Sequence, residues 1–201
     1  GGTDTLIAVE NITGSAFGDT IISSTGDSTI DGGAGDDTIS AGSGTESLSG
    51  GLGTDLLIAD FSANAVAVTT TRSGDDISLV TVLEQASVST LTIDGFERAF
   101  LTGSNLGDVL VGGALADTLF GGDGNDTLIA NAGDDSVAGG FGNDSIIAGD
   151  GTNTIAGGSG IDTVDFSSRT AAISINLATG TGTDTLTGIE VVIGTDQLDS
   201  I

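Results

Sequence analysis

The chain is marked first by the side chains that it lacks. Its 201 residues include no cysteine, proline, methionine, tryptophan, tyrosine or histidine, and its three cations are Arg72, Arg98 and Arg169. Without cysteine, disulfide bonds cannot hold the fold together. Without histidine, cysteine or lysine, nucleophilic and zinc chemistry have no candidate residues. No run approaches the roughly 18 consecutive apolar residues of a membrane-spanning helix. From these absences together we expect neither an enzyme nor a membrane span.

Positive charge is almost absent as well. Against three arginines stand 29 acidic residues, which gives a formal net charge of −26. Such self-repulsion opposes a compact state unless counter-ions bind. Nucleic acids and anionic membranes are therefore poor partners, and a divalent cation is the expected one.

What the chain does have is glycine, in a nine-residue repeat of the form G-G-x-G-x-D-x-U-x, where U is aliphatic. Full copies include residues 32–40, 121–129 and 139–147. The same frame runs from Gly14 to Ile58 and from Gly103 to Asp165, and it begins again at Gly194. Its eighth position is always aliphatic, as expected of a residue that faces a narrow core: Ile21, Ile30, Ile39, Leu48, Leu57, Leu110, Leu119, Leu128, Val137, Ile146, Ile155, Val164 and Ile201.

These copies resemble the RTX, or haemolysin-type calcium-binding, repeat family. The resemblance implies an all-β fold, a parallel β-roll or β-solenoid in which G-G-x-G-x-D forms a turn and x-U-x a short strand. Eighteen residues then complete one coil, so that turns alternate between two edges. Calcium would lie between stacked turns, held by the sixth-position aspartate and by carbonyls near the first and third positions.

Residues 18 apart should share an edge, which predicts the calcium ligands. In the first block one edge carries Asp19, Asp37 and Asp55, and the other carries Ser28 and Glu46, which should bind weakly or not at all. In the second block one edge carries Asp108, Asp126, Asp144 and Asp162, and the other carries Asp117, Asp135 and Asn153. The family implies carbonyl ligands at Gly32, Gly50, Gly121, Gly139 and Gly157. Phe17, Leu106 and Leu115 replace the fourth-position glycine and weaken the prediction for their turns.

The repeat blocks are interrupted by alternating apolar segments, including 65–68, 77–83 and 173–177, which predict longer strands. We divide the chain into a first block with its lead-in strand (1–58), a spacer (59–102), a second block (103–165), and a spacer with a truncated third block (166–201). All three arginines lie in the spacers. A cation beside a calcium site would compete with the metal, which explains this exclusion.

A longer repeat of roughly 90 residues overlies the short one. Gly14, Gly103 and Gly194 are equivalent points of this repeat, and each follows a glutamate, at Glu10, Glu97 or Glu190. These glutamates are either ligands or, as we favour, strand-edge hydrogen-bond partners. The matching terminal pieces suggest a tandem array in which one subunit continues the coil of the next.

The leading functional hypothesis is an extracellular, calcium-dependent structural protein: a surface-layer (S-layer), fibre or adhesin-stalk segment that folds on binding Ca²⁺ and self-associates head-to-tail or in a lattice. The alternative is an accessory region that aids type I secretion and folding of an RTX enzyme or toxin whose active domain lies elsewhere. A carbohydrate-binding module is disfavoured by the scarcity of aromatics. A glycosidase would need one carboxyl group with a raised pKa in an apolar cleft, whereas repeated carboxylates are all equivalent.

Overall fold

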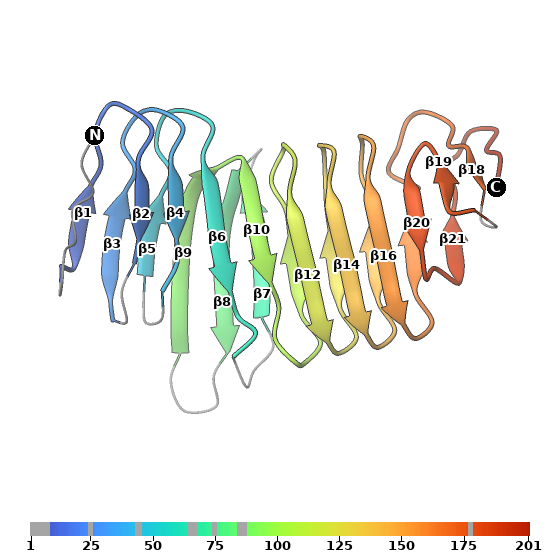
Figure 1. The fold of residues 1–201 in the computed structure, drawn as a ribbon, viewed down its shortest axis with the longest axis horizontal. Coiled ribbons are helices and arrows are strands. Elements are labelled where there is room, and N and C mark those ends of the chain that lie inside the picture. Colours follow the sequence, from blue (N-terminus) through green and yellow to red (C-terminus); the bar gives the residue numbers. More distant parts are fainter. Residues whose placement is uncertain are drawn as a thin grey trace.

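The computed structural model describes residues 9–23, 26–42, 46–63, 68–73, 76–83, 88–176 and 179–201. They form an elongated parallel β-solenoid, with the N- and C-termini at opposite ends (Figure 1). The predicted all-β parallel β-roll is therefore confirmed. The lead-in residues 1–8 and most of the predicted 65–68 strand lie outside the described residues. The described part of the chain contains no helix with the length and apolar character needed to cross a bilayer.

Two sheets make the walls of the solenoid. Sheet A contains, in spatial order, β1 (Asn11–Thr13), β3 (Ser28–Asp31), β5 (Glu46–Ser49), β9 (Val88–Phe96), β8 (Asp76–Leu83), β7 (Val68–Ser73), β11 (Val109–Val111), β13 (Thr127–Ile129), β15 (Ser145–Ile147), β17 (Thr163–Asp165) and β21 (Val191–Ile193). Sheet B contains β2 (Thr20–Ile22), β4 (Thr38–Ser40), β6 (Leu56–Asp60), β10 (Arg98–Thr102), β12 (Thr118–Asp123), β14 (Ser136–Phe141), β16 (Thr154–Ser159) and β20 (Thr185–Thr187). A separate hairpin joins β18 (Ile175–Asn176) to β19 (Thr181–Gly182).

The strand register has the 18-residue period that the nonapeptide predicts. Leu128 pairs with Leu110 on one side and with Ile146 on the other, and all three lie in sheet A. Val137 pairs in the same way with Leu119 and Ile155 in sheet B. Successive nonapeptides therefore alternate between the sheets, and residues 18 apart stack directly on one another.

The core is a column of the eighth-position side chains. They are 0–2% exposed throughout the interior of the solenoid, because alternate residues of a strand point to opposite faces. Only the two end members differ: Ile21 is partly buried and Ile201 is 55% exposed. Phe61 and Phe166, which follow the two blocks, lie in the same buried cluster, where they extend the core past the last repeat of each block.

The first spacer inserts antiparallel strands without breaking the solenoid. Strands β7, β8 and β9 form a meander between β5 and β11 in sheet A. In sheet B the single strand β10 pairs in parallel with both β6 and β12. The two repeat blocks thus share both sheets and form one continuous coil.

Candidate metal sites along two carboxylate ladders

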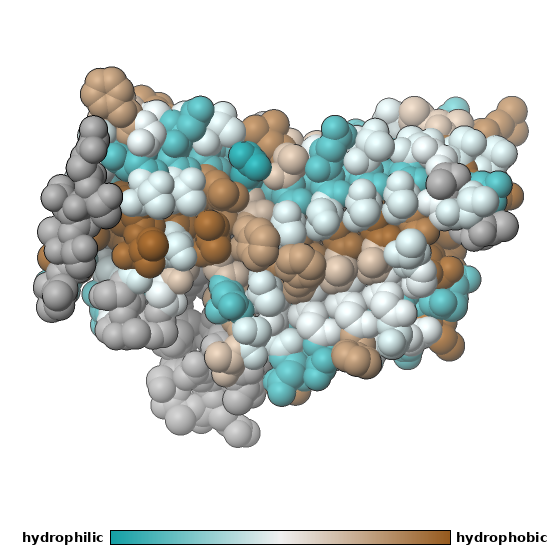
Figure 2. Space-filling model, in the orientation of Figure 1, coloured by the Kyte–Doolittle hydropathy of each residue, from teal (hydrophilic) through white to brown (hydrophobic). Residues whose placement is uncertain are grey.

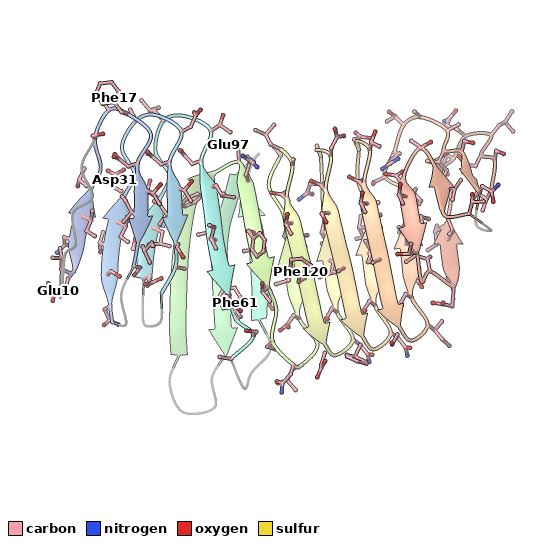
Figure 3. The ribbon with its side chains drawn as sticks, in the orientation of Figure 1. Glu10, Phe17, Asp31, Phe61, Glu97 and Phe120 are labelled. Atoms are coloured by element: carbon pink, nitrogen blue, oxygen red, sulfur yellow. The ribbon has the colours of Figure 1, made fainter. Side chains whose placement is uncertain are left out.

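The sixth-position side chains stack into two ladders, one at the edge where each sheet's strands begin. The sheet-B ladder runs along the top of Figure 1, and Figure 3 labels its Glu97. It consists of Asp19, Asp37, Asp55, Glu97, Asp117, Asp135, Asn153 and Asp184. The sheet-A ladder consists of Asp108, Asp126, Asp144, Asp162 and Glu190. The predicted sharing of edges within each block therefore holds in the structure.

Along each ladder, one carboxylate oxygen accepts a hydrogen bond from the backbone of the neighbouring coil. The Oδ1 atom of Asp144 accepts a hydrogen bond of 2.9 Å from the backbone N–H of Asp126, and Oδ1 of Asp162 accepts one of 2.9 Å from Asp144. Glu97 and Glu190 act in the same way, through Oε2 atoms that accept from the backbone N–H of Asp55 at 2.7 Å and of Asp162 at 2.8 Å. These two glutamates therefore make the strand-edge hydrogen bonds that we favoured over ligand roles.

At six ladder positions the second carboxylate oxygen has no such partner among the described residues. The Oδ2 atoms concerned are buried and accept no hydrogen bond from the described residues. They belong to Asp37, Asp55, Asp126, Asp135, Asp144 and Asp162. Leaving a buried charged acceptor unsatisfied costs more than a typical hydrogen bond contributes. Six equivalent cases in register indicate a missing positive partner rather than chance.

The turn glycines place carbonyl oxygens opposite these atoms. A β-carbon added at Gly139 would stand 2.5 Å from the carbonyl oxygen of Gly157 in the next coil, and against Oδ2 of Asp144. At Gly121 the same β-carbon would stand 2.5 Å from the carbonyl oxygen of Gly139 and against Oδ2 of Asp126. First-position glycines thus leave room where a carboxylate and a carbonyl from stacked coils face each other.

In a second kind of turn a backbone N–H group donates to Oδ2. We call these turns closed, and we call the six turns whose Oδ2 atom lacks a partner open. Oδ2 accepts from the N–H of the second turn residue at 2.6 Å in the Asp19, Asp108 and Asp199 turns, and at 2.7 Å in the Asp117 turn. The fourth positions of these closed turns are Phe17, Leu106, Gln197 and Leu115, respectively. The doubt that the sequence raised about the Phe17, Leu106 and Leu115 turns thus has a structural basis.

Backbone conformation separates the two kinds of turn. The open turns have positive φ at both their second and fourth positions: Gly33 and Gly35, Gly51 and Gly53, Gly122 and Gly124, Asn131 and Gly133, Gly140 and Gly142, and Gly158 and Gly160. A leucine or phenylalanine avoids that region because its Cβ collides with the backbone. Its turn keeps negative φ, and the second-residue N–H then points to Oδ2.

This difference predicts that a closed turn can be opened. Replacing Ser104 and Leu106 together with glycine gives the Asp108 turn the glycines of an open one. We expect the variant to bind one more calcium ion than the parent chain, as counted by equilibrium dialysis. Asn105→Gly changes only the third position and should leave the count unchanged. An unaltered count in the double variant would contradict the assignment of turn class to these two positions.

Burial shapes the electrostatics of the ladders. Desolvation raises the pKa of Asp117 and Asp126 to about 7 and that of Asp135 to about 6, although backbone N–H donors to the same groups oppose the rise. Burial also raises the pKa of Asp55 and Asp144. Hydrogen bonds from Ser15 lower the pKa of Asp19. The five carboxylates whose pKa is raised thus resist ionisation in the absence of a nearby cation.

The donor set indicates which metal fits. The described residues contain no cluster of three or more histidine, cysteine, aspartate or glutamate side chains that could hold an ion. Any site must therefore combine one or two carboxylates with backbone carbonyls. Calcium accepts such all-oxygen, flexible coordination, whereas zinc prefers nitrogen and sulfur ligands.

The Ser28–Glu46 edge is filled by protein donors instead. Glu46 is buried, and its Oε1 accepts hydrogen bonds from the hydroxyls of Ser23 and Ser28. The backbone N–H of Gly42 lies 3.1 Å from Oε1 and 3.2 Å from Oε2. Both oxygens of Glu46 therefore accept hydrogen bonds from the protein, and weak or absent calcium binding on this edge stays a prediction.

Asp184 is a ladder residue that sequence reasoning missed. It lies 31 residues beyond Asn153, whose backbone N–H donates to its Oδ1 at 2.7 Å. The intervening spacer breaks the nine-residue frame. A signal was nevertheless present, because Thr183-Asp184-Thr185-Leu186-Thr187 matches the x-D-x-U-x half of the repeat.

Comparison with known proteins identifies the repeats. A family model described as the RTX calcium-binding nonapeptide repeat matches in four copies, at residues 13–45, 24–57, 102–137 and 129–164. The matched ranges together span more than half of the chain and include every open turn. No curated protein matches the chain.

Proposed function

Because the chain belongs to the RTX calcium-binding nonapeptide repeat family, we propose that it is an extracellular, calcium-dependent structural segment whose β-roll folds as Ca²⁺ enters the open turns. The observation that carries this proposal is the set of six buried Oδ2 atoms without partners, in a chain of net charge −26. An ion at each gap supplies the missing partner and cancels ladder repulsion. Folding and metal binding then become one event.

The open turns are the proposed calcium sites. Their carboxylate ligands are Asp37, Asp55, Asp126, Asp135, Asp144 and Asp162. The carbonyl oxygens that face five of these carboxylates belong to Gly50, Gly95, Gly139, Gly157 and Gly188, whereas the predicted carbonyls of Gly32 and Gly121 face Asp19 and Asp108. Asp19, Asp108 and Asp117 lie in closed turns, where a backbone N–H already occupies Oδ2. We assign these three turns weaker binding. Affinities at single sites should lie roughly in the 10⁻⁴ to 10⁻³ M range of extracellular calcium modules.

Circular dichroism of the chain in chelator and then in calcium tests the proposal. We expect a largely disordered spectrum in chelator and a full β-sheet spectrum in millimolar calcium. Magnesium at the same concentration should not replace calcium, because it retains its waters and demands a stricter octahedral geometry. A β-sheet spectrum that chelation leaves unchanged would show that the fold does not depend on calcium.

Two surfaces support assembly as part of the proposed function. Among the described residues β1 and β21 each pair on one side only, and both are parallel strands of sheet A. Residues 10–14 and 190–194 are the corresponding pieces of the long repeat, so β21 corresponds to β1, and each presents one edge of sheet A that no described strand pairs with. Unpaired strand edges of this kind favour pairing with another chain.

The outer face of sheet B adds an apolar stripe, which crosses the middle of Figure 2 beneath a hydrophilic edge. It includes Ile22, 74% exposed, and the rings of Phe100 and Phe120, whose centroids are 5.7 Å apart. Figure 3 labels Phe120. We propose that the strand edges mediate end-to-end stacking and that this stripe mediates lateral contacts.

Light scattering of the same calcium-loaded samples tests assembly separately from folding. Large particles that chelator disperses would support a fibre or surface-layer role. A folded monomer in calcium would instead favour the alternative, an accessory region that assists type I secretion and folding of an attached RTX enzyme or toxin.

A further inference from the structure

Arg169 is a buried cation, and it lies at the C-terminal end of the sheet-B ladder. Its guanidinium contacts Asp184 through two parallel hydrogen bonds, Nη1 to Oδ2 at 2.7 Å and Nη2 to Oδ1 at 2.9 Å. Its Nε donates to the carbonyl oxygen of Gly149, and its Cζ lies 4.7 Å from the centre of the Phe166 ring. Arg169 is 7% exposed and Asp184 is fully buried.

The guanidinium joins the same two kinds of group that face each other in the open turns. Asp184 is a ladder carboxylate, because its Oδ1 also accepts the N–H of Asn153 at 2.7 Å. Gly149 is the second residue of the preceding turn on that edge. In the open turns a ladder Oδ2 faces a turn carbonyl with no donor between them, whereas here a planar cation donates to both.

The preceding position of the ladder is closed as well. Asn153 replaces the usual aspartate, and its Nδ2 donates to the carbonyl oxygen of Ala148 at 2.8 Å. Its Oδ1 keeps the ladder function by accepting the N–H of Asp135 at 2.9 Å. At the last two positions of the sheet-B ladder, the polar side-chain atoms therefore find their hydrogen-bond partners within the protein.

We propose that Arg169 is a built-in counter-ion that takes the place of calcium at the last position of the sheet-B ladder. Together with Asn153 it closes, without metal, the sheet-B edge of the two stacked coils that contain β16 and β20, so that this end of the solenoid retains structure when calcium is removed. The inference rests on the proposed function, since it matters only if the other coils need calcium. On the opposite edge of the same coils Asp144 and Asp162 remain open, and calcium still stabilises them there.

Hydrogen exchange with mass spectrometry on the full chain tests this assignment. In calcium we expect protection in peptides that cover β16 and β20 and in peptides that cover β2 and β4. In chelator the β16 and β20 peptides should still exchange at least about ten-fold more slowly than the β2 and β4 peptides, because exchange reports regional opening. Arg169→Gln should abolish that difference, because it leaves the Asp184 carboxylate buried without its counter-charge.

Arg98→Gln is the matched control. Arg98 is exposed, its Nε donates to the carbonyl oxygen of Ala116 at a long 3.4 Å, and its charge acts on Asp117 in the middle of the solenoid, far along the chain from Asp184. Its loss should leave the regional difference in chelator intact.

The possible results separate the two proposals. If both regions exchange equally fast in chelator but are protected in calcium, the Arg169 assignment is overturned and calcium-dependent folding stands. If both regions stay protected in chelator, calcium-dependent folding is overturned. If the regional difference persists in Arg169→Gln, contacts other than those of Arg169 preserve the structure in chelator, and the Arg169 assignment is overturned. The wild-type comparison decides the first two results even if Arg169→Gln fails to fold.

Discussion

Replacing Asp126, Asp144 and Asp162 together with asparagine is expected to stabilise the calcium-free β-roll. The precedent lies within the chain, since Asn153 keeps the Oδ1 hydrogen bond of a ladder residue and donates from Nδ2 to the first carbonyl of its own turn. An asparagine at each open position would make the same two contacts. It would remove an unsatisfied buried oxygen, which costs about 1–3 kcal/mol, and one negative charge.

The measurement is the urea midpoint of unfolding in chelator, followed by circular dichroism. We expect the triple asparagine variant to retain β-sheet signal under conditions in which the parent chain is disordered. Its calcium response should weaken, because three sites have lost their carboxylate.

Two controls separate this mechanism from a simple loss of charge. The triple alanine variant loses the same three charges and also the Oδ1 acceptors, so it should fold poorly with or without calcium. Asparagine at the exposed Asp60, Asp150 and Asp196 removes equal charge outside the six open turns. If this surface variant folds in chelator as well as the ladder variant does, general repulsion rather than the open turns controls folding.

The parts of the structure that the sequence predicted are those with strict local period. An aliphatic residue every nine positions fixed the core, because a three-residue strand has only one inward side chain. The stacking of Asp126, Asp144 and Asp162 followed from the same period, since two nonapeptides make one coil.

Features that depend on the spacers could not be predicted in this way. The first spacer places Glu97 next to Asp55 across 42 residues of chain, and the ladder of Asp19, Asp37 and Asp55 then continues into the Asp117 edge rather than the Asp108 edge. Spacer length and strand count, rather than repeat phase, decide this continuation. The buried pairing of Arg169 with Asp184 was hidden for the same reason: the nonapeptide frame does not extend into the second spacer.

The partners of the individual carboxylate oxygens could be predicted only in part. The motif alone treats Asp108 and Asp126 as equivalent, yet a backbone N–H occupies Oδ2 of the first and not of the second. The substitution of Leu106 for glycine was visible in the sequence, but its consequence depends on how backbone φ directs one N–H group.

The second large effect is a reversal of pH dependence by calcium. Without metal, the pKa of Asp126 and that of Asp117 are raised from 3.8 to about 7, and that of Asp135 to about 6. The folded chain therefore binds more protons than the unfolded chain between about pH 4 and pH 7, and its stability falls as the pH rises through that window. We expect acidification in chelator to promote β-sheet structure and a return to neutral pH to remove it.

With calcium present the sign is opposite, because only the ionised carboxylates bind the metal. Binding then releases protons, and the apparent calcium affinity should fall as the pH is lowered from about 7 to 5, within the window of the raised pKa values. Calcium titrations followed by circular dichroism at several pH values measure this shift, and the proton release is measured directly in weakly buffered solution. The triple asparagine variant lacks the titrating group of Asp126 and should show a smaller shift in both measurements. A calcium-free chain that gains structure as the pH rises would contradict the assignment of the open turns as uncompensated carboxylates, because their burial would then not oppose ionisation.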